Sequence, residues 1–410
     1  MSTARRRLRR VVLAFALSAF APSGWGQAPL AWTPTERAQI LSHGPWTHDP
    51  RPDRSNRVEG RPSAIRFGKT LFFDADLSAD RARSCASCHV PRKAFQDGLP
   101  TAAGRTRGIR NTPALLDVAR WRWFGWGGSH DSLWAASLAP LLAEGEMGHS
   151  IGTLAARARE TPAWAPAYAA AFGRPMPADD EALAVDLAKA LAAYQATLSS
   201  PPTPFDAFRD ALARGDDAAA GAYPIAAQRG LRIFIGEGRC SVCHAGPAFS
   251  NGEFGDTGVP FFVPGGVDPG RHAGLDALIG DRMNRLGPFN DAGASDPGAV
   301  PTRHLAREHR HFGEFRVPGL RQLLHTAPYM HDGSIASLEA VVRHYDRLDE
   351  ERLHADGERI LRPLALAPGA FADLVSFLRT LSSDDAGWVS EAPDPQRPRA
   401  PAGRPPRPIP

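Results

Sequence analysis

Residues 238–250 read GRCSVCHAGPAFS, so that two residues separate Cys240 from Cys243 and His244 follows the second cysteine directly. The whole chain of 410 residues contains four cysteines. The meaning of this segment therefore depends on where the other two cysteines lie.

The remaining cysteines repeat the same pattern. Residues 84–91 read SCASCHVP and place Cys85, Cys88 and His89 at the same spacing. Cys-x-x-Cys-His is the attachment signature of c-type haem, in which two thiols bond to the vinyl groups and the histidine coordinates the iron. A zinc site built from both pairs would leave both histidines unexplained and would join cysteines 155 residues apart. The two motifs therefore predict two covalently bound haems c.

The N-terminus, residues 1–28, has the pattern of a secretory signal peptide. Five arginines precede an apolar run from Val11 to Ala21, and small residues follow at Gly26 and Ala28. The run is too short for a permanent membrane helix, although an uncleaved anchor remains the alternative. Export suits c-type haem, so we expect a periplasmic protein with no membrane span after cleavage.

The formal charge of +4 comes largely from this leader. Removing its five arginines from the 48 basic residues leaves 43 against 44 acidic residues, which gives no basic surface for nucleic acid. The Pro/Arg-rich stretch 390–410 cannot build a core, and we expect a disordered tail there.

Helical periodicity dominates the rest of the chain. It appears in residues 62–74, 183–198, 224–235, 334–345 and 368–381. The sequence predicts an all-α fold of two cytochrome c-like domains, each with one haem c, joined by long irregular loops. We expect the N-terminal domain over 29–215 and the C-terminal domain over 216–389.

The first haem lacks an obvious second axial ligand. Residues 90–129 contain neither histidine nor methionine, and the next candidates are His130, Met147 and His149. The simplest interpretation is an iron open to an oxidant near Glu146, because one carboxyl above an open iron can move the proton that peroxide cleavage requires.

With these features, the chain resembles bacterial di-haem cytochrome c peroxidases and the related MauG proteins over nearly all of residues 60–382. The resemblance rests on both haem motifs and on three segments: RNTPALLDVA (110–119), WGGSHDSLWAASLAPLLAEGEMG (126–148) and FRVPGLRQLLHTAPYMHDGSIASLEAVVRHYD (315–346). It implies that hydrogen peroxide reacts at the first haem, with Glu146 as acid and base, Pro140 in the pocket, and Trp126 between the haems.

The resemblance also implies further ligands and partners. Asn111, Thr326 and Pro328 match the positions that hold a calcium ion between the domains, and their oxygen atoms are hard donors that suit calcium. The electron donor would be a small redox protein, either a cytochrome c or a cupredoxin. A MauG-like enzyme would instead oxidise a protein or small-molecule substrate.

The second haem carries a distinguishing position. Tyr345 lies fourteen residues after His331, where the peroxidases have a methionine ligand and MauG has tyrosine. A phenolate favours ferric or higher states, whereas a thioether favours ferrous iron. The alternative ligands are His344, Met330 and His331.

Two other interpretations remain open from the sequence. A di-haem electron carrier without peroxidase activity would have two protein ligands on each iron. Within the 281–312 segment, His304, His309 and His311 are either surface metal ligands or part of a solvated basic loop.

Overall fold

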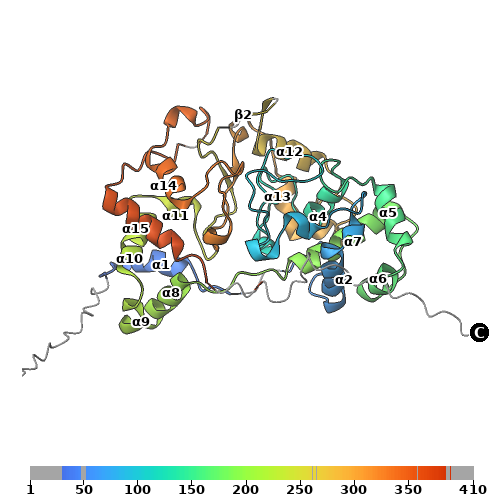
Figure 1. Cartoon of the computed structure of the whole chain (residues 1–410), viewed down its shortest axis with the longest axis horizontal. Coiled ribbons are helices and arrows are strands. Elements are labelled where there is room, and N and C mark those ends of the chain that lie inside the picture. The colour runs from blue at the N-terminus through green and yellow to red at the C-terminus, as the bar shows by residue number, and fades with distance from the viewer. Residues whose placement is uncertain are drawn as a thin grey trace, which may run out of the picture.

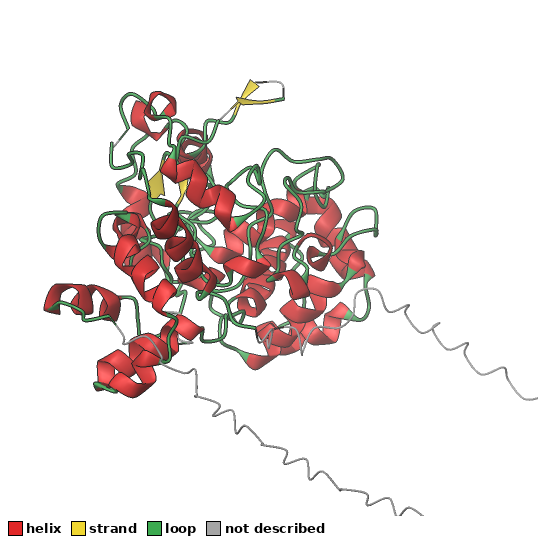
Figure 2. Ribbon diagram, turned by 60° about the vertical axis from the view of Figure 1, so that its left-hand side comes forward, coloured by secondary structure: helices red, strands yellow, loops and turns green. Residues whose placement is uncertain are grey.

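The computed structural model describes residues 30–47, 52–260, 262–264, 266–357, 359–384 and 388. The signal peptide expected at 1–28 and the tail expected at 390–410 lie outside these residues. The described part is mostly helical, with long loops and two small strand pairs, which confirms the predicted all-α class (Figures 1 and 2).

The α-helices follow one another along the whole described chain. Their bounds are α1 Pro34–Ser42, α2 Pro62–Phe73, α3 Cys85–Cys88, α4 Leu133–Leu142, α5 Ile151–Glu160, α6 Trp164–Phe172, α7 Asp180–Gln195, α8 Pro204–Arg214, α9 Asp217–Gly221, α10 Ile225–Ile235, α11 Cys240–Cys243, α12 Arg271–Gly280, α13 Val300–Arg303, α14 Leu338–Asp346 and α15 Pro368–Arg379. The antiparallel strand pairs are β1 Phe254–Gly255 with β4 Phe315–Arg316, and β2 Phe262–Val263 with β3 Gly266–Val267.

The first hydrophobic core lies between α2, α4, α5, α6 and α7. Gly68 on α2 explains how closely α2 and α7 approach, because a Cβ at Gly68 would lie 1.9 Å from the carbonyl oxygen of Ala190. Two helix backbones can come this near only where one of them lacks a side chain. The short helix α3, which carries the first pair of cysteines, in turn contacts α2.

The second core repeats this arrangement with α10 and α15. A Cβ at Gly230 on α10 would lie 1.9 Å from the carbonyl oxygen of Asp373 on α15. The two cores form separate lobes, with α10, α14 and α15 on one side and α2, α4 and α7 on the other (Figure 1).

Two helices of the expected N-terminal half pack against the second core. Ile40 of α1 and Phe205 and Phe208 of α8 belong to that core, and α1 contacts both α8 and α10. We therefore propose that the boundary between the domains lies near residues 198–204 rather than at 215, with α1 crossing to the second lobe. Among the described residues, no helix combines the length and the apolar character needed to cross a bilayer.

Candidate functional site

Each Cys-x-x-Cys-His segment forms a single helical turn. The backbone N–H of His89 donates to the carbonyl of Cys85 at 2.9 Å, and that of His244 donates to the carbonyl of Cys240 at 2.8 Å. Residues three and four apart lie on the same face of a helix, so each turn presents two thiols and an imidazole together. No disulfide joins the cysteines of either pair.

The two motif histidines are held in the same way. The Nδ1 atom of His89 lies 2.9 Å from the carbonyl oxygen of Phe95, and that of His244 lies 2.9 Å from the carbonyl oxygen of Phe249. Both phenylalanines are buried and have positive φ, 60° and 54°. A carbonyl can only accept, so Nδ1 carries the proton and Nε2 keeps its lone pair for a metal. This arrangement fits a haem-ligating histidine at both motifs.

Burial favours the uncharged forms of the motif histidines and cysteines. It lowers the pKa of His89 and of His244, so both imidazoles are neutral near pH 7. It also raises the pKa of the Cys85 and Cys240 thiols to about 12.

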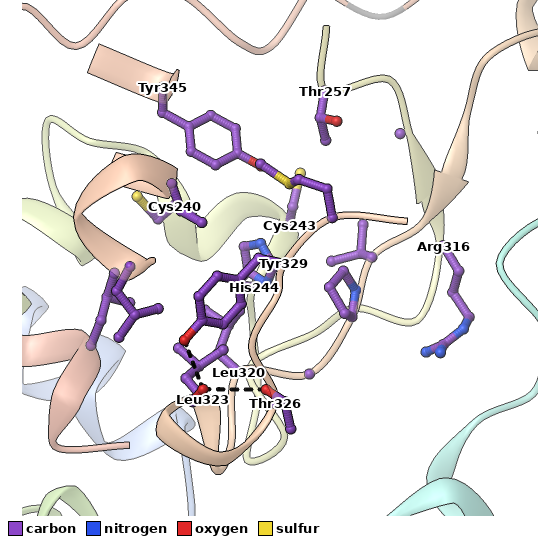
Figure 3. Close-up of a pocket in the computed structure, with 18 of the residues that line it drawn as sticks. Cys240, Cys243, His244, Thr257, Arg316, Leu320, Leu323, Thr326, Tyr329 and Tyr345 are labelled. Atoms are coloured by element: carbon purple, nitrogen blue, oxygen red, sulfur yellow. Dashed lines mark hydrogen bonds between the residues drawn. The ribbon is translucent and has the colours of Figure 1, made fainter. Parts of the chain in front are cut away.

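A cavity of ≈ 280 Å³ lies beside the second motif and is lined by Cys240, Cys243, His244 and Tyr345 (Figure 3). Most of its wall is apolar, with Leu374 and Leu378 from α15 and Leu338, Val341 and Val342 from α14. Two thiols, one neutral imidazole and an apolar wall are the surroundings that a covalently attached porphyrin requires.

Tyr345 reaches this cavity because of the register of α14. The side chain of Ser337 caps the helix by accepting from the N–H of Ala340 at 3.2 Å, and Val341 and Tyr345 then lie one turn apart on the cavity side. Figure 3 shows the phenol pointing from α14 towards the segment with Cys243 and His244. Burial and the two nearby cysteines raise the pKa of the Tyr345 hydroxyl.

The three alternative ligands are placed differently. His344 is not among the residues that line the cavity, and its Nε2 atom lies 2.7 Å from the carbonyl oxygen of Thr257. His331 lines the cavity, but its ring stacks on Phe315 with centroids 3.4 Å apart, and burial lowers its pKa to about 4. Met330 also lines the cavity and, with Tyr345, remains a candidate by position.

Glu146 lies beside the first motif. The carbonyl oxygen of Ala103 lies 4.0 Å from the Cys88 Sγ atom, and a Cβ on the next residue, Gly104, would lie 3.3 Å from the Cα of Glu146. The negative charge of Glu146 accordingly contributes to the raised pKa of the Cys85 and Cys88 thiols. The side chain is exposed, yet desolvation by the surrounding protein raises its own pKa. The carboxyl therefore combines access to solvent with a raised affinity for a proton.

The loop that carries Glu146 is fixed at both ends. The N–H of Met147 donates to the carbonyl of Pro140 at 3.1 Å, which ties the loop to the last turn of α4. The N–H of Thr106 donates to the carbonyl of Gly145 at 3.0 Å, which ties it to the segment after the first motif. The loop that carries Glu146 is thus held against the end of α4 that contains Pro140.

The tryptophans after the first motif divide into two groups. Trp123 and Trp134 are buried in packing roles, whereas Trp121 and Trp126 line the cavity of the second motif. The indole N–H of Trp126 donates to the carbonyl of Asn111 at 2.8 Å. Trp126 therefore belongs to the first half of the chain but lies at the wall of the second site. Sequence reasoning missed Trp121, which has the same position at the cavity.

Asn111, Thr326 and Pro328 line the same cavity wall. The side-chain Nδ2 atom of Asn111 donates to the carbonyl of Leu99 at 2.7 Å, which leaves the Oδ1 atom as the free ligand atom of the amide. The Thr326 hydroxyl donates to the carbonyl of Leu323 at 3.3 Å (Figure 3). Oxygen donors from both halves of the chain thus line one cavity, and calcium prefers oxygen ligands of this kind.

The histidines of the 281–312 segment do not gather together. The Nδ1 atom of His309 lies 2.8 Å from a carboxylate oxygen of Asp356, and its ring contacts that of His354. The Nδ1 atom of His354 accepts from the N–H of Asp356 at 3.3 Å. The ligand atoms of His309, His354 and Asp356 lie within 4.8 Å of one another, so this group could hold a metal ion. Both interpretations of His309 from the sequence, a surface metal ligand and part of a solvated loop, therefore stay open.

Comparisons with known proteins extend over most of the chain. The family model for di-haem cytochrome c peroxidase matches residues 62–214. The methylamine utilization protein MauG of Methylorubrum extorquens is 34% identical over 79% of this chain and 80% of its own length. The cytochrome-c peroxidase IdrP1 of a Pseudomonas strain is 32% identical over 78% of this chain and 81% of its own length.

The fold is also similar to a solved structure. A MauG-like protein associated with microbial copper homeostasis superposes with a TM-score of 0.63 at 25% identity, covering 85% of this chain and 96% of that one.

Proposed function

Because the chain belongs to the di-haem cytochrome c peroxidase and MauG family, and is a haem peroxidase of that type, we propose that it activates hydrogen peroxide at the haem of the first motif. In this proposal Cys85 and Cys88 attach that haem and His89 ligates its iron. Cys240 and Cys243 attach the second haem, which His244 and Tyr345 ligate. The observation that carries the proposal is the position of the Glu146 carboxyl beside the first pair of cysteines.

At the first site, the haem and the protein side chains have different roles in the proposed reaction. When bound, the first haem supplies the redox chemistry that cleaves the O–O bond of peroxide. Glu146 accepts the proton of one peroxide oxygen and returns it to the other, which leaves as water. Phe95 holds the imidazole of His89 through its carbonyl, which fixes the tautomer that can ligate iron. Pro140 lies in the last turn of α4, next to the loop that carries Glu146.

The second site is suited to storing oxidising equivalents. A phenolate oxygen from Tyr345 stabilises ferric and higher states and disfavours reduction. Trp126 lies at the wall of this site and is the group through which the two haems exchange electrons in our proposal. This arrangement favours MauG-like oxidation of a protein or small-molecule substrate. Peroxide reduction fed by a cytochrome c or a cupredoxin is the variant that a more easily reduced second haem would allow.

Two further features complete the proposal. Calcium binds at Asn111, Thr326 and Pro328 and holds the two halves together across the cavity wall. The protein acts in the periplasm, which the Arg-rich leader and the covalent haem attachment support.

The Glu146→Gln variant tests this function. We expect it to carry both haems but to change its Soret band with peroxide about 10²–10⁴ times more slowly than the wild type. Glu144→Gln is the matched control, because Glu144 is an exposed acid two residues away. Equal rates in both variants and the wild type would remove Glu146 from the mechanism. A wild type inert to peroxide would identify an electron carrier instead.

A further inference from the structure

Arg316 is a buried arginine at the wall of the cavity beside the second motif. It is 8% exposed and lies on β4, whose partner strand is β1. Within the described ranges, the Nε and Nη1 atoms of its guanidinium are buried and have no hydrogen-bond partner. Figure 3 places Arg316 at the side of the cavity opposite Cys240.

The charge of Arg316 also lacks a counter-ion among the described residues. Burial lowers its pKa to about 10 and is the cause of the whole shift, so the group stays charged at neutral pH without help from a carboxylate. Arg321, which lines the same cavity, instead makes two hydrogen bonds of 2.7 and 2.8 Å to the carboxylate of Asp206. Buried charges in proteins are normally paired, so Arg316 requires an anion that the polypeptide does not supply.

The chemistry of haem c identifies this anion. The porphyrin carries its vinyl groups at one edge and two propionates at the opposite edge, so attachment to Cys240 and Cys243 directs the propionates across the cavity. We propose that Arg316 is the counter-ion of a propionate carboxylate of this second haem. The inference rests on the proposed function only in taking a haem to be attached there. Guanidinium N–H groups make strong charge-assisted hydrogen bonds to carboxylate oxygens, and the Nε and Nη1 atoms of Arg316 are two buried donors without a partner among the described residues.

The location of Arg316 gives this pair a role in electron transfer. The guanidinium carbon lies 5.0 Å from the centre of the Trp121 ring, and the backbone N–H of Arg316 donates to the carbonyl of Trp126 at 2.8 Å. Arg316 therefore holds the propionate edge of the haem against the wall that carries both tryptophans. It is a positioning residue, and its positive charge raises the reduction potential of the second haem.

The holoprotein with Arg316→Gln tests the proposal. Loss of the cation leaves a buried propionate unpaired, which stabilises the ferric state. We expect the midpoint potential of the second haem to fall by at least about 59 mV, a tenfold change in the one-electron equilibrium constant. We also expect the propionate-bending band in the resonance Raman spectrum to shift. Arg362→Gln is the matched control, because Arg362 lines the same cavity but is exposed, and both readouts should stay close to the wild type.

Two results would overturn the proposal. One is an Arg316→Gln protein that carries both haems with the wild-type potential and Raman band, and the other is an equal shift in both variants. If Arg316→Gln does not fold, Arg316→Lys is measured instead, because an ammonium group cannot reproduce the hydrogen bonds of the Nε and Nη1 donors and the Raman band must still move. Haem content and the peroxide reaction of the wild type are measured separately, so failure of the proposed function is distinguishable from failure of this inference.

Discussion

His344 and Tyr345 are neighbours on α14, but their side chains point in different directions from the helix. His344 Nε2 lies 2.7 Å from the carbonyl oxygen of Thr257, whereas the Tyr345 phenol lines the cavity of the second motif. Successive helical residues point about 100° apart, so only one of the two can face that cavity. Within this pair, position therefore favours Tyr345 as the haem ligand.

Tyr345→Phe should remove the oxygen ligand of the second haem. We expect the low-spin ferric signal in electron paramagnetic resonance to change and the potential of that haem to rise, because an anionic ligand is lost. His344→Gln is the control and should leave the signal unchanged. A signal that follows His344 rather than Tyr345 would contradict the assignment.

The reaction with peroxide should depend on pH through Glu146. Desolvation raises the pKa of this carboxyl above its usual 4.5. As a base Glu146 must be ionised, so the rate should fall as the pH drops through the raised pKa, beginning at a higher pH than an ordinary carboxyl would require. Stopped-flow rates across the acidic pH range measure this fall in rate. If the same fall persisted in Glu146→Gln, the pH dependence would belong to another group.

The two close helix contacts should control stability. Gly68→Ala and Gly230→Ala place a Cβ 1.9 Å from a carbonyl oxygen, so each helix pair must separate. We expect each substitution to lower the free energy of unfolding by about 2 kcal/mol or more. Gly369→Ala is the control, because a Cβ there meets nothing within 4 Å and alanine favours the helix. Thermal unfolding of the three variants measures this effect. If Gly68→Ala and Gly230→Ala lowered the stability no more than Gly369→Ala does, the two close contacts would not contribute to stability.

Calcium binding should depend on Asn111. Asn111→Ala removes the free Oδ1 atom but keeps the backbone of the residue, whose carbonyl accepts from Trp126. We expect the calcium content of the purified protein to fall at least tenfold. Asn290→Ala, at a buried asparagine outside the cavity lining, should retain the ion. If neither the wild type nor the variants contained calcium, Asn111, Thr326 and Pro328 would have a structural role only.

The sequence predicted the helices that flank the haem motifs closely. Residues 62–74 and 224–235 correspond to α2 Pro62–Phe73 and α10 Ile225–Ile235, because their apolar periodicity and their position before each motif are local signals. The helix expected at 334–345 begins later, at Leu338, because Ser337 caps it. Local pattern could not show that α1 packs with the second core, since that contact joins distant parts of the chain.

The sequence predicted the site residues that belong to a recognisable motif, but it missed those whose role depends on their burial in the fold. The Cys-x-x-Cys-His pattern and the position of Tyr345 are visible in the letters alone. Arg316 gave no signal, because its importance comes from the absence of a carboxylate partner around it among the described residues. The resemblance singled out Trp126, but Trp121 could not be separated from Trp123 and Trp134 until the fold placed it at the cavity.

The ferric protein's electron paramagnetic resonance spectrum tests the central claim most directly. A first iron that is open beside Glu146 and a second iron ligated by His244 and Tyr345 predict one high-spin and one low-spin signal of equal intensity, with the high-spin signal lost on addition of hydrogen peroxide. Two low-spin signals that peroxide does not alter would contradict the account.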